Sequence, residues 1–197
     1  MKYIYEEKIF VGSSSKSIFR LMTFIINWWR TIPCQILYVF SSKKDLIISD
    51  FGSYSNMVRT LVFAKHNRNL FYHRIGRKSI LYSWILSGDK SIKLPFSCSL
   101  GKHVHFVHND SCHLNAKSIG DDFICYPHVV IGAKNLYCSG KPIIGNNVTI
   151  GTGAVIVGNI VIGDNVRIGA NSFVCQNIPS DSNVFGNPAI IKGINIK

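Results

Sequence analysis

The sequence predicts a mainly β protein in which a parallel β-helix of six-residue repeats follows a small helical region. Three observations support this fold class. Aliphatic residues recur at every sixth position from Ile144 to Val174, and a glycine follows most of them. The first half of the chain lacks this repeat and carries most of the positive charge. With 197 residues, 47% of them apolar, the chain can fold as one ordinary domain or two small ones.

The repeat itself identifies the β-helix. Its aliphatic positions are Ile144, Ile150, Ile156, Ile162, Ile168 and Val174, and its glycines are Gly145, Gly151, Gly163 and Gly169. No α-helix has a period of six, and simple strand alternation does not need a small residue at every sixth place. Each hexad therefore supplies one short strand and a turn, and three hexads close a triangular coil. The aliphatic residue points into the prism, and the glycine permits a tight corner.

Upstream the repeat is looser. It passes through Leu100, Phe106, Cys112, Ile119, Cys125 and Ile131. One residue is added between Cys112 and Ile119, and the step from Ile131 to Ile144 is thirteen residues long. That long step contains residues 135–142, whose glycine and proline suit a loop extruded from the stack. Such insertions gather on the binding face of repeat proteins, although a plain bulge is the alternative.

Residues 1–92 are predicted to form the helical region. Apolar stretches with interleaved basic residues indicate helices at 18–29, 56–65 and 69–86, joined by connections at 52–55 and 87–89. The predicted domains are this region, a β-helix over residues 93–192, and a tail over 193–197.

The basic charge lies in the helical region. The chain has 22 basic and 10 acidic residues, and residues 1–93 hold 15 of the basic and 5 of the acidic ones. This excess indicates a polyanionic partner. We expect no nucleic acid, because no nucleic-acid-binding motif is visible. Residues 18–40 are too interrupted by charges and Pro33 to span a membrane, but residues 21–30 suit a membrane interface. A helical cap with solubilising lysines is the alternative.

The six cysteines are scattered without a CxxC pair, and no signal peptide is evident. We therefore expect reduced thiols in a cytoplasmic protein, with peripheral contact to the inner membrane face left open. The cluster of His103, His105, His108, Cys112 and His113 suggests a metal, but corners every six residues would scatter these side chains. No recognised zinc spacing is present either, so we expect no metal.

Residues 144–154, 162–172 and 177–189 resemble the hexapeptide-repeat acyltransferases. The nearest branch is the serine acetyltransferase-like group, which includes capsule and lipopolysaccharide O-acetyltransferases. Residues 94–101 and the following Val107-His108-Asn109 resemble the approach to that family's catalytic histidine, and residues 67–76 resemble its preceding helix. The resemblance covers about residues 60–192. It implies a left-handed β-helix and a homotrimer.

The resemblance implies that His108 is the catalytic base. A neutral imidazole is suited to accept a hydroxyl proton near pH 7 while the oxygen attacks acetyl-CoA directly. Backbone N–H groups would stabilise the oxyanion. In serine-specific members a carboxylate orients the histidine, but Lys93 occupies that position here, so Asp110 or a backbone carbonyl would have to replace it. We expect Asn109, Asp110 and Lys141 to contact the acceptor, with Lys141 at the position of the family's second histidine.

The same resemblance places acetyl-CoA in a groove between neighbouring subunits. The residues expected to contact it are Gly132, Ala133, Gly151, Thr152, Gly169, Ala170 and Lys192. Small residues let the ligand approach the backbone closely, and Lys192 would meet a phosphate. Turn geometry alone is the alternative explanation for each glycine.

We therefore expect an acetyl-CoA-dependent O-acetyltransferase acting on a sugar hydroxyl of a surface polysaccharide or its precursor. One alternative is a serine O-acetyltransferase of cysteine biosynthesis, although Lys93 in place of the carboxylate argues against it. The other is a non-catalytic β-helix that binds a partner or a lipid surface.

Overall fold

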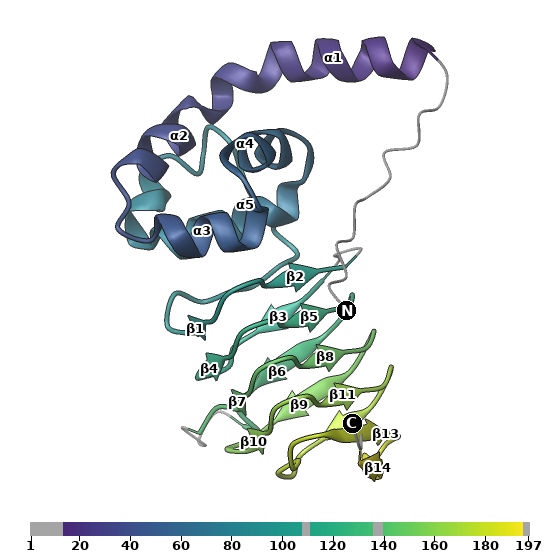
Figure 1. Cartoon of the computed structure of the whole chain (residues 1–197). Helices are drawn as coiled ribbons and strands as arrows, with labels where there is room; N and C mark the ends of the chain where they lie inside the picture. The colour runs from purple at the N-terminus through teal and green to yellow at the C-terminus, as the bar shows by residue number, and fades with distance from the viewer. Residues whose placement is uncertain (1–13, 108–110, 136–139, 195–197) are drawn as a thin grey trace.

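A computed structural model describes residues 14–107, 111–135 and 140–194 and shows a helical region above a triangular β-helix (Figure 1). The predicted fold class is confirmed: the protein is mainly β, with a left-handed parallel β-helix and an N-terminal helical region. The helices gather at one end of the stack, and the chain then descends coil by coil to β14 at the other end.

The helical region contains five α-helices among the described residues, two more than the sequence predicted. They are α1 (Ser14–Trp28), α2 (Ile32–Val39), α3 (Lys44–Phe51), α4 (Tyr54–Phe63) and α5 (Lys65–Ile75), with 3-10 turns η1 (Trp29–Thr31) and η2 (Arg77–Leu81). The expected helices at 18–29 and 56–65 correspond to α1 and α4. The helix expected over 69–86 ends instead at Gly76, whose φ of 82° stops α5.

Three parallel sheets form the faces of the prism, and the chain visits them in a fixed order. The first face contains β1 (Ser99–Leu100), β4 (Ser118–Ile119), β7 (Ile143–Ile144) and β10 (Val161–Ile162). The second contains β2 (His105–Phe106), β5 (Ile124–Cys125), β8 (Thr149–Ile150), β11 (Arg167–Ile168), β13 (Ser182–Phe185) and β14 (Ile190–Ile194). The third contains β3 (His113–Leu114), β6 (Val130–Gly132), β9 (Val155–Val157) and β12 (Phe173–Val174).

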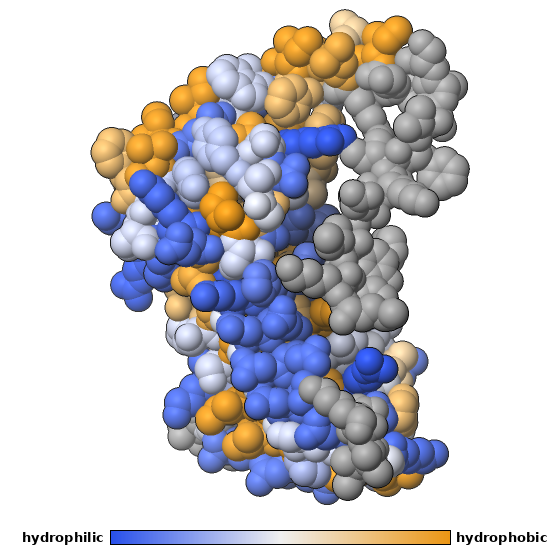
Figure 2. Space-filling model, viewed as in Figure 1, coloured by the Kyte–Doolittle hydropathy of each residue, from blue (hydrophilic) through white to orange (hydrophobic). Residues whose placement is uncertain are grey.

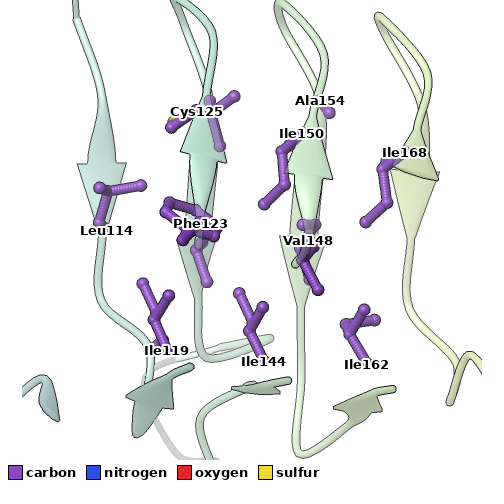
Figure 3. Packing of buried hydrophobic residues seen from close by; sticks show 14 of the residues in the cluster. Leu114, Ile119, Phe123, Cys125, Ile144, Val148, Ile150, Ala154, Ile162 and Ile168 are labelled. Carbon is purple, nitrogen blue, oxygen red and sulfur yellow. The ribbon is translucent and has the colours of Figure 1, made fainter. Parts of the chain in front are cut away.

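The aliphatic residues of the repeat stack inside the prism and form its core (Figure 3). On the first face Ile119 pairs with Ile144, and Ile144 pairs with Ile162. On the second face Ile150 and Ile168 pair in the same way, and both are almost completely buried. The register between neighbouring coils therefore follows the six-residue period predicted from the sequence.

The upstream register differs from the sequence prediction. Leu114, not Cys112, occupies the repeat position of the third face, where it pairs with Ile131. Leu114 follows Phe106 by eight positions, whereas Ile131 follows Cys125 by six. The first coil is therefore longer by two residues at the corner between the second and third faces. Cys112 and Leu114 are both fully buried apolar residues, so hydropathy alone did not distinguish them.

The corner between the first and second faces carries a column of polar residues in the left-handed backbone region. These residues are His103, Asp122, Asn147, Asn165 and Asp181, with φ between 53° and 61°. Asn147 Nδ2 donates to Asn165 Oδ1 over 2.8 Å, and Asn165 Nδ2 donates to Asp181 Oδ1 over 2.9 Å. Asn and Asp adopt this conformation more readily than other side chains, so they replace glycine here while linking successive coils.

A buried ion pair joins the helical region to the first coil. Arg74 on α5 donates to both carboxylate oxygens of Asp50 on α3, over 2.8 and 3.1 Å, and the two side chains are 3% and 0% exposed. Arg74 also donates to the carbonyl oxygens of Leu100 and Gly101, while Asp50 accepts from the backbone N–H of Val104. Burial raises the pKa of Asp50, and the bonds from Arg74 oppose that rise.

Replacing Asp50 with alanine should destabilise the protein strongly. The Asp50→Ala variant leaves the Arg74 guanidinium buried without its anionic partner, which costs about 3–5 kcal/mol of unfolding free energy. Urea unfolding followed by circular dichroism measures the difference. The matched control, Asp45→Ala in the exposed first turn of α3, should lose less than about 1 kcal/mol. Equal losses of unfolding free energy in the two variants would show that the ion pair does not stabilise the junction between the helical region and the first coil.

Candidate functional site

The predicted base and two predicted acceptor contacts, His108, Asn109 and Asp110, lie outside the described residues. The described residues on either side, Val107 and Ser111, belong to the chain between β2 on the second face and β3 on the third. This is the corner that is two residues longer in the first coil than in the second. The enlarged corner therefore coincides with the segment to which the resemblance assigned catalysis.

Four of the predicted cofactor residues lie on the same edge of the prism as Val107. The backbone N–H of Val107 donates to the carbonyl oxygen of Cys125, and that of Tyr126 donates to the carbonyl oxygen of Ile150. The N–H groups of Gly151 and Gly169 donate in the same way to the carbonyl oxygens of Ile168 and Val184. These bonds stack Val107, Tyr126, Gly151 and Gly169 on successive coils. Thr152 and Ala170 directly follow the two glycines and are exposed. This edge therefore leads from the corner that precedes His108, past the half-buried Tyr126, to two glycine corners that are each followed by an exposed residue.

The remaining predicted residues lie elsewhere in the same chain. Gly132 ends β6 on the third face, and Ala133 follows it at the opposite edge of that face. Lys141 also lies at that edge, directly before Pro142, whose carbonyl accepts from the backbone N–H of Lys117. Lys192 is exposed on β14 at the far end of the stack. Within one chain, the structure therefore brings together Gly151, Thr152, Gly169 and Ala170 but not the others.

The space around each glycine shows whether packing between coils is enough to explain why a glycine stands there. A Cβ built on Gly151 would lie 2.6 Å from the backbone nitrogen of Ala170, so close packing between coils requires this glycine. A Cβ on Gly169 would clash with the ring of Phe185. No heavy atom lies within 4 Å of a Cβ on Gly132, and its φ is not positive. Coil packing therefore explains Gly151 and Gly169 but leaves Gly132 unexplained.

A cavity of about 500 Å³ lies between the helical region and the first coil, and the sequence analysis missed it. Polar side chains that line it include Asn69, His73, Ser83, Asp89, Lys90 and Lys93. The backbone N–H of Lys93 donates to the carbonyl of Cys112 over 2.7 Å, so the cavity wall adjoins the enlarged corner. Its residues come from segments read separately as helix and connection, and their common cavity is visible only in the fold.

The histidine in this cavity wall is neutral at physiological pH. His73 on α5 has its Nε2 atom 3.2 Å from the carbonyl oxygen of Pro95. Burial, reinforced by the nearby charge of Arg74, lowers the pKa of His73 to about 4. The charged groups of the cavity wall are then Asp89, Lys90 and Lys93.

Among the other described histidines, His103, His105, His113 and His128 are exposed on the coils, and His66 is half-buried on α5. His103 Nδ1 lies 3.1 Å from Asp122 Oδ1, within the polar column of the first corner. His105 and His113 are exposed on β2 and β3, which belong to different faces. Within residues 14–107, 111–135 and 140–194, no three His, Cys, Asp or Glu side chains are grouped closely enough to hold a metal ion.

Two buried thiols lie behind the enlarged corner. Cys112 and Cys125 are fully buried, and each Sγ lies 3.4 Å from the carbonyl oxygen of Tyr126. The hydrogen bond between the thiols lowers the pKa of Cys112 to about 6 and, with burial, raises that of Cys125. The described cysteines are free, and only Cys175 among them is exposed. Because Cys112 is inaccessible, we assign it to the core of the prism.

Comparison with protein families finds a match to part of the chain. Residues 141–176 match the family model described as bacterial transferase hexapeptide (six repeats). This segment is thus similar to transferase hexapeptide repeats. It contains β7 to β12 and the Gly151 and Gly169 corners. No curated protein matches the whole chain significantly.

Solved structures of serine acetyltransferases share the fold. The enzyme from Neisseria gonorrhoeae is 22% identical and covers 80% of this chain and 69% of its own, with a TM-score of 0.66. The enzyme from Vibrio cholerae O1 biovar El Tor N16961 is 23% identical, covers 83% and 70%, and has a TM-score of 0.68. A serine acetyltransferase in complex with CoA is 23% identical, covers 87% and 75%, and has a TM-score of 0.63. At this identity the likeness establishes the fold.

The two kinds of glycine should respond differently to alanine. Gly151→Ala forces a Cβ against the next coil and should lower the melting temperature by several degrees, an effect of about 1–3 kcal/mol. Gly132→Ala meets open space and should leave the melting temperature unchanged. If acetyl-CoA passes Gly132, this stable variant should show a raised KM for acetyl-CoA. An unchanged KM would remove Gly132 from the cofactor site.

Proposed function

We propose that this protein is an O-acetyltransferase that transfers an acetyl group from acetyl-CoA to an alcohol. The transferase repeats at 141–176 support the reaction class, and the fold shared with serine acetyltransferases supports the donor. The single observation that carries the proposal for this chain is the edge from Val107 to Gly169. On this edge the glycine corners at Gly151 and Gly169, each followed by an exposed residue, are aligned with the enlarged corner next to His108. Since acetyl-CoA is a cytoplasmic metabolite, the reaction would take place in the cytoplasm.

In the proposed mechanism His108 activates the acceptor. Acetyl-CoA supplies an acyl group already activated as a thioester. His108 accepts the hydroxyl proton as the acceptor oxygen forms a bond to the acetyl carbon, the carbon–sulfur bond breaks, and the proton passes to the departing thiolate. Backbone N–H groups of the corner donate to the developing oxyanion. Asn109 and Asp110 would orient the acceptor and the imidazole.

A homotrimer would complete this site. Four of the predicted cofactor and acceptor residues lie on two edges of the third face, with Gly151 and Gly169 on one and Gly132 and Lys141 on the other. A groove between two copies can bring different edges together, whereas one prism holds them apart. This arrangement supports the subunit groove that the family resemblance implies.

Serine is the acceptor that the solved structures favour. The solved structures compared above are serine acetyltransferases, and one from Neisseria gonorrhoeae was determined in complex with serine. A serine site needs an anion for the amino group and a cation for the carboxylate. The cavity wall offers Asp89 with Lys90 or Lys93 for these roles. Asp89 accepts two hydrogen bonds from Ser91, which lower its pKa and keep it anionic.

A sugar is the acceptor that the side chains of this open pocket favour. The hydroxyl side chains of Ser83 and Ser87 suit sugar hydroxyls. Lys93 stands where serine-specific enzymes place an orienting carboxylate, and with Lys90 it suits a phosphate on the acceptor.

A direct assay separates the acceptors. Release of free CoA from acetyl-CoA is measured with a thiol reagent in the presence of serine or of a panel of nucleotide-linked and lipid-linked sugars. Rapid release with serine assigns the protein to cysteine synthesis, and release only with sugars assigns it to glycan modification. Failure to bind acetyl-CoA at all, measured by calorimetry, would replace the enzyme with a binding scaffold.

Loss of the imidazole at position 108 should abolish most of the activity. His108→Ala removes the proposed base, and turnover should fall about a hundredfold or more while the oligomer stays intact. His105→Ala is the matched control, because this histidine is exposed on β2, outside the proposed site. Steady-state kinetics and light scattering measure both effects. Near-normal turnover in His108→Ala would overturn the assignment.

A further inference from the structure

Many large apolar side chains are exposed along α1, η1 and α2, and we call this surface the outer face. Its members are Ile18, Leu21, Met22, Ile25, Ile26, Trp28, Trp29, Ile32, Ile36, Val39 and Phe40, each between 40% and 85% exposed. Figure 2 shows this apolar band along the top of the molecule, away from the β-helix. Soluble proteins rarely leave so many neighbouring large apolar side chains in water.

Helix α1 leaves most of its large apolar residues in solvent. These residues recur at intervals of three and four, so they share one side of the helix. Phe24 faces inward, where it packs against the core of the helical region and stacks on Phe63 with ring centroids 6.3 Å apart. Directly after α1, Arg30 of η1 donates twice to the carbonyl of Ile85 over 3.2 and 2.8 Å, and Thr31 is fully buried. Phe24 and η1 therefore hold the helix on the protein, while its wide apolar side has no cover among the described residues.

The tryptophans support an interfacial environment. All three tryptophans of the chain, Trp28, Trp29 and Trp84, are exposed, at 44%, 58% and 78%. The hydrogen bond from Arg30 to the carbonyl of Ile85 holds the segment that contains Trp84 next to η1. Trp29 and Trp84 are the residues directly before these two bonded residues, so the bond brings their segments together. Tryptophan is enriched where a bilayer meets water, because its ring is apolar and its N–H is polar.

Basic residues adjoin exposed apolar residues at two places in the chain, and the exposed Asp45 is the acidic neighbour of one of these pairs. Lys43 and Lys44 are exposed just beyond Phe40, and Arg77 and Lys78 are exposed just before the exposed Ile80 and Leu81. Residues 14–42 contain no Asp or Glu. Basic residues beside an apolar face complement anionic lipid headgroups beside acyl chains.

We propose that the outer face docks in the plane of an anionic membrane surface, with α1 and α2 at the boundary between headgroups and acyl chains. No helix of the described chain is long and apolar enough to cross a membrane, so the helices would lie along the bilayer. Pairing of this face with the same face of a second copy would bring the basic residues of both copies together, and their repulsion disfavours that occupant. The proposal stands independently of the acetyltransferase activity.

Vesicle binding tests the proposal with the full chain. Sedimentation compares vesicles of phosphatidylcholine with vesicles containing about one-third phosphatidylglycerol. We expect binding at least about tenfold stronger to the anionic vesicles, a blue shift of tryptophan emission on binding, and weakening at high salt. Absence of binding to anionic vesicles, or equal binding to both kinds, would overturn the proposal.

Two variants make the test specific to the outer face. Leu21→Glu combined with Ile25→Glu places charges on the outer face, away from the inner contacts of α1, and should reduce binding about tenfold or more. Ile190→Glu, on the exposed side of β14, is the matched control and should bind as the wild type does. Circular dichroism confirms that both remain folded. Unchanged vesicle binding by the double variant would show that the outer face is not a membrane surface. The same conclusion follows if the wild type does not bind vesicles and the double variant differs from it only in a lower oligomer mass.

Discussion

The pair of Asp50 and Arg74 is the constraint on which the relation between the two halves of the protein depends. Its charges come from α3 and α5, and its remaining hydrogen bonds reach Leu100, Gly101 and Val104 in the first coil. A buried carboxylate and guanidinium tolerate little displacement, because every lost bond leaves a desolvated charge. The helical region is thereby fixed above the coil that leads to His108. The cavity between them exists because this spacing is maintained.

The sequence predicted the β-helix well where its repeat is regular, and less well where two apolar residues competed for one position. From Ile144 onward a single aliphatic residue in each hexad points inward, so period and register coincide. Near Cys112 and Leu114 both residues are buried, one at the corner and one on the strand, and only the pairing with Ile131 distinguishes them. In the helical region, Pro33 was read as a break, but it occupies the first turn of α2, where proline is tolerated.

The candidate site was only partly predictable, because family motifs do not say on which edge of the prism each residue lies. The motifs assigned roles to single residues, and pairing between coils placed Gly151 and Gly169 on the edge that leads to Val107. Pairing also placed Gly132 and Lys141 on another edge, which no one-dimensional pattern can show. The cavity depends on contacts between α5, η2 and residues 87–96, so its composition of Asn, Ser, Lys and Asp side chains became visible only after folding.

The two ends of the stack have a consequence for how the protein behaves at high concentration. Open parallel coils present unpaired N–H and C=O groups that could join another prism end to end. At the lower end β14 turns back antiparallel along β13, and residues 178 and 189 hydrogen-bond to the neighbouring faces. At the upper end Arg74 occupies carbonyls of the first coil. The antiparallel return of β14 and the helical region thus interrupt the parallel repeat at both ends, so a second prism cannot simply continue the same coil pattern along the axis.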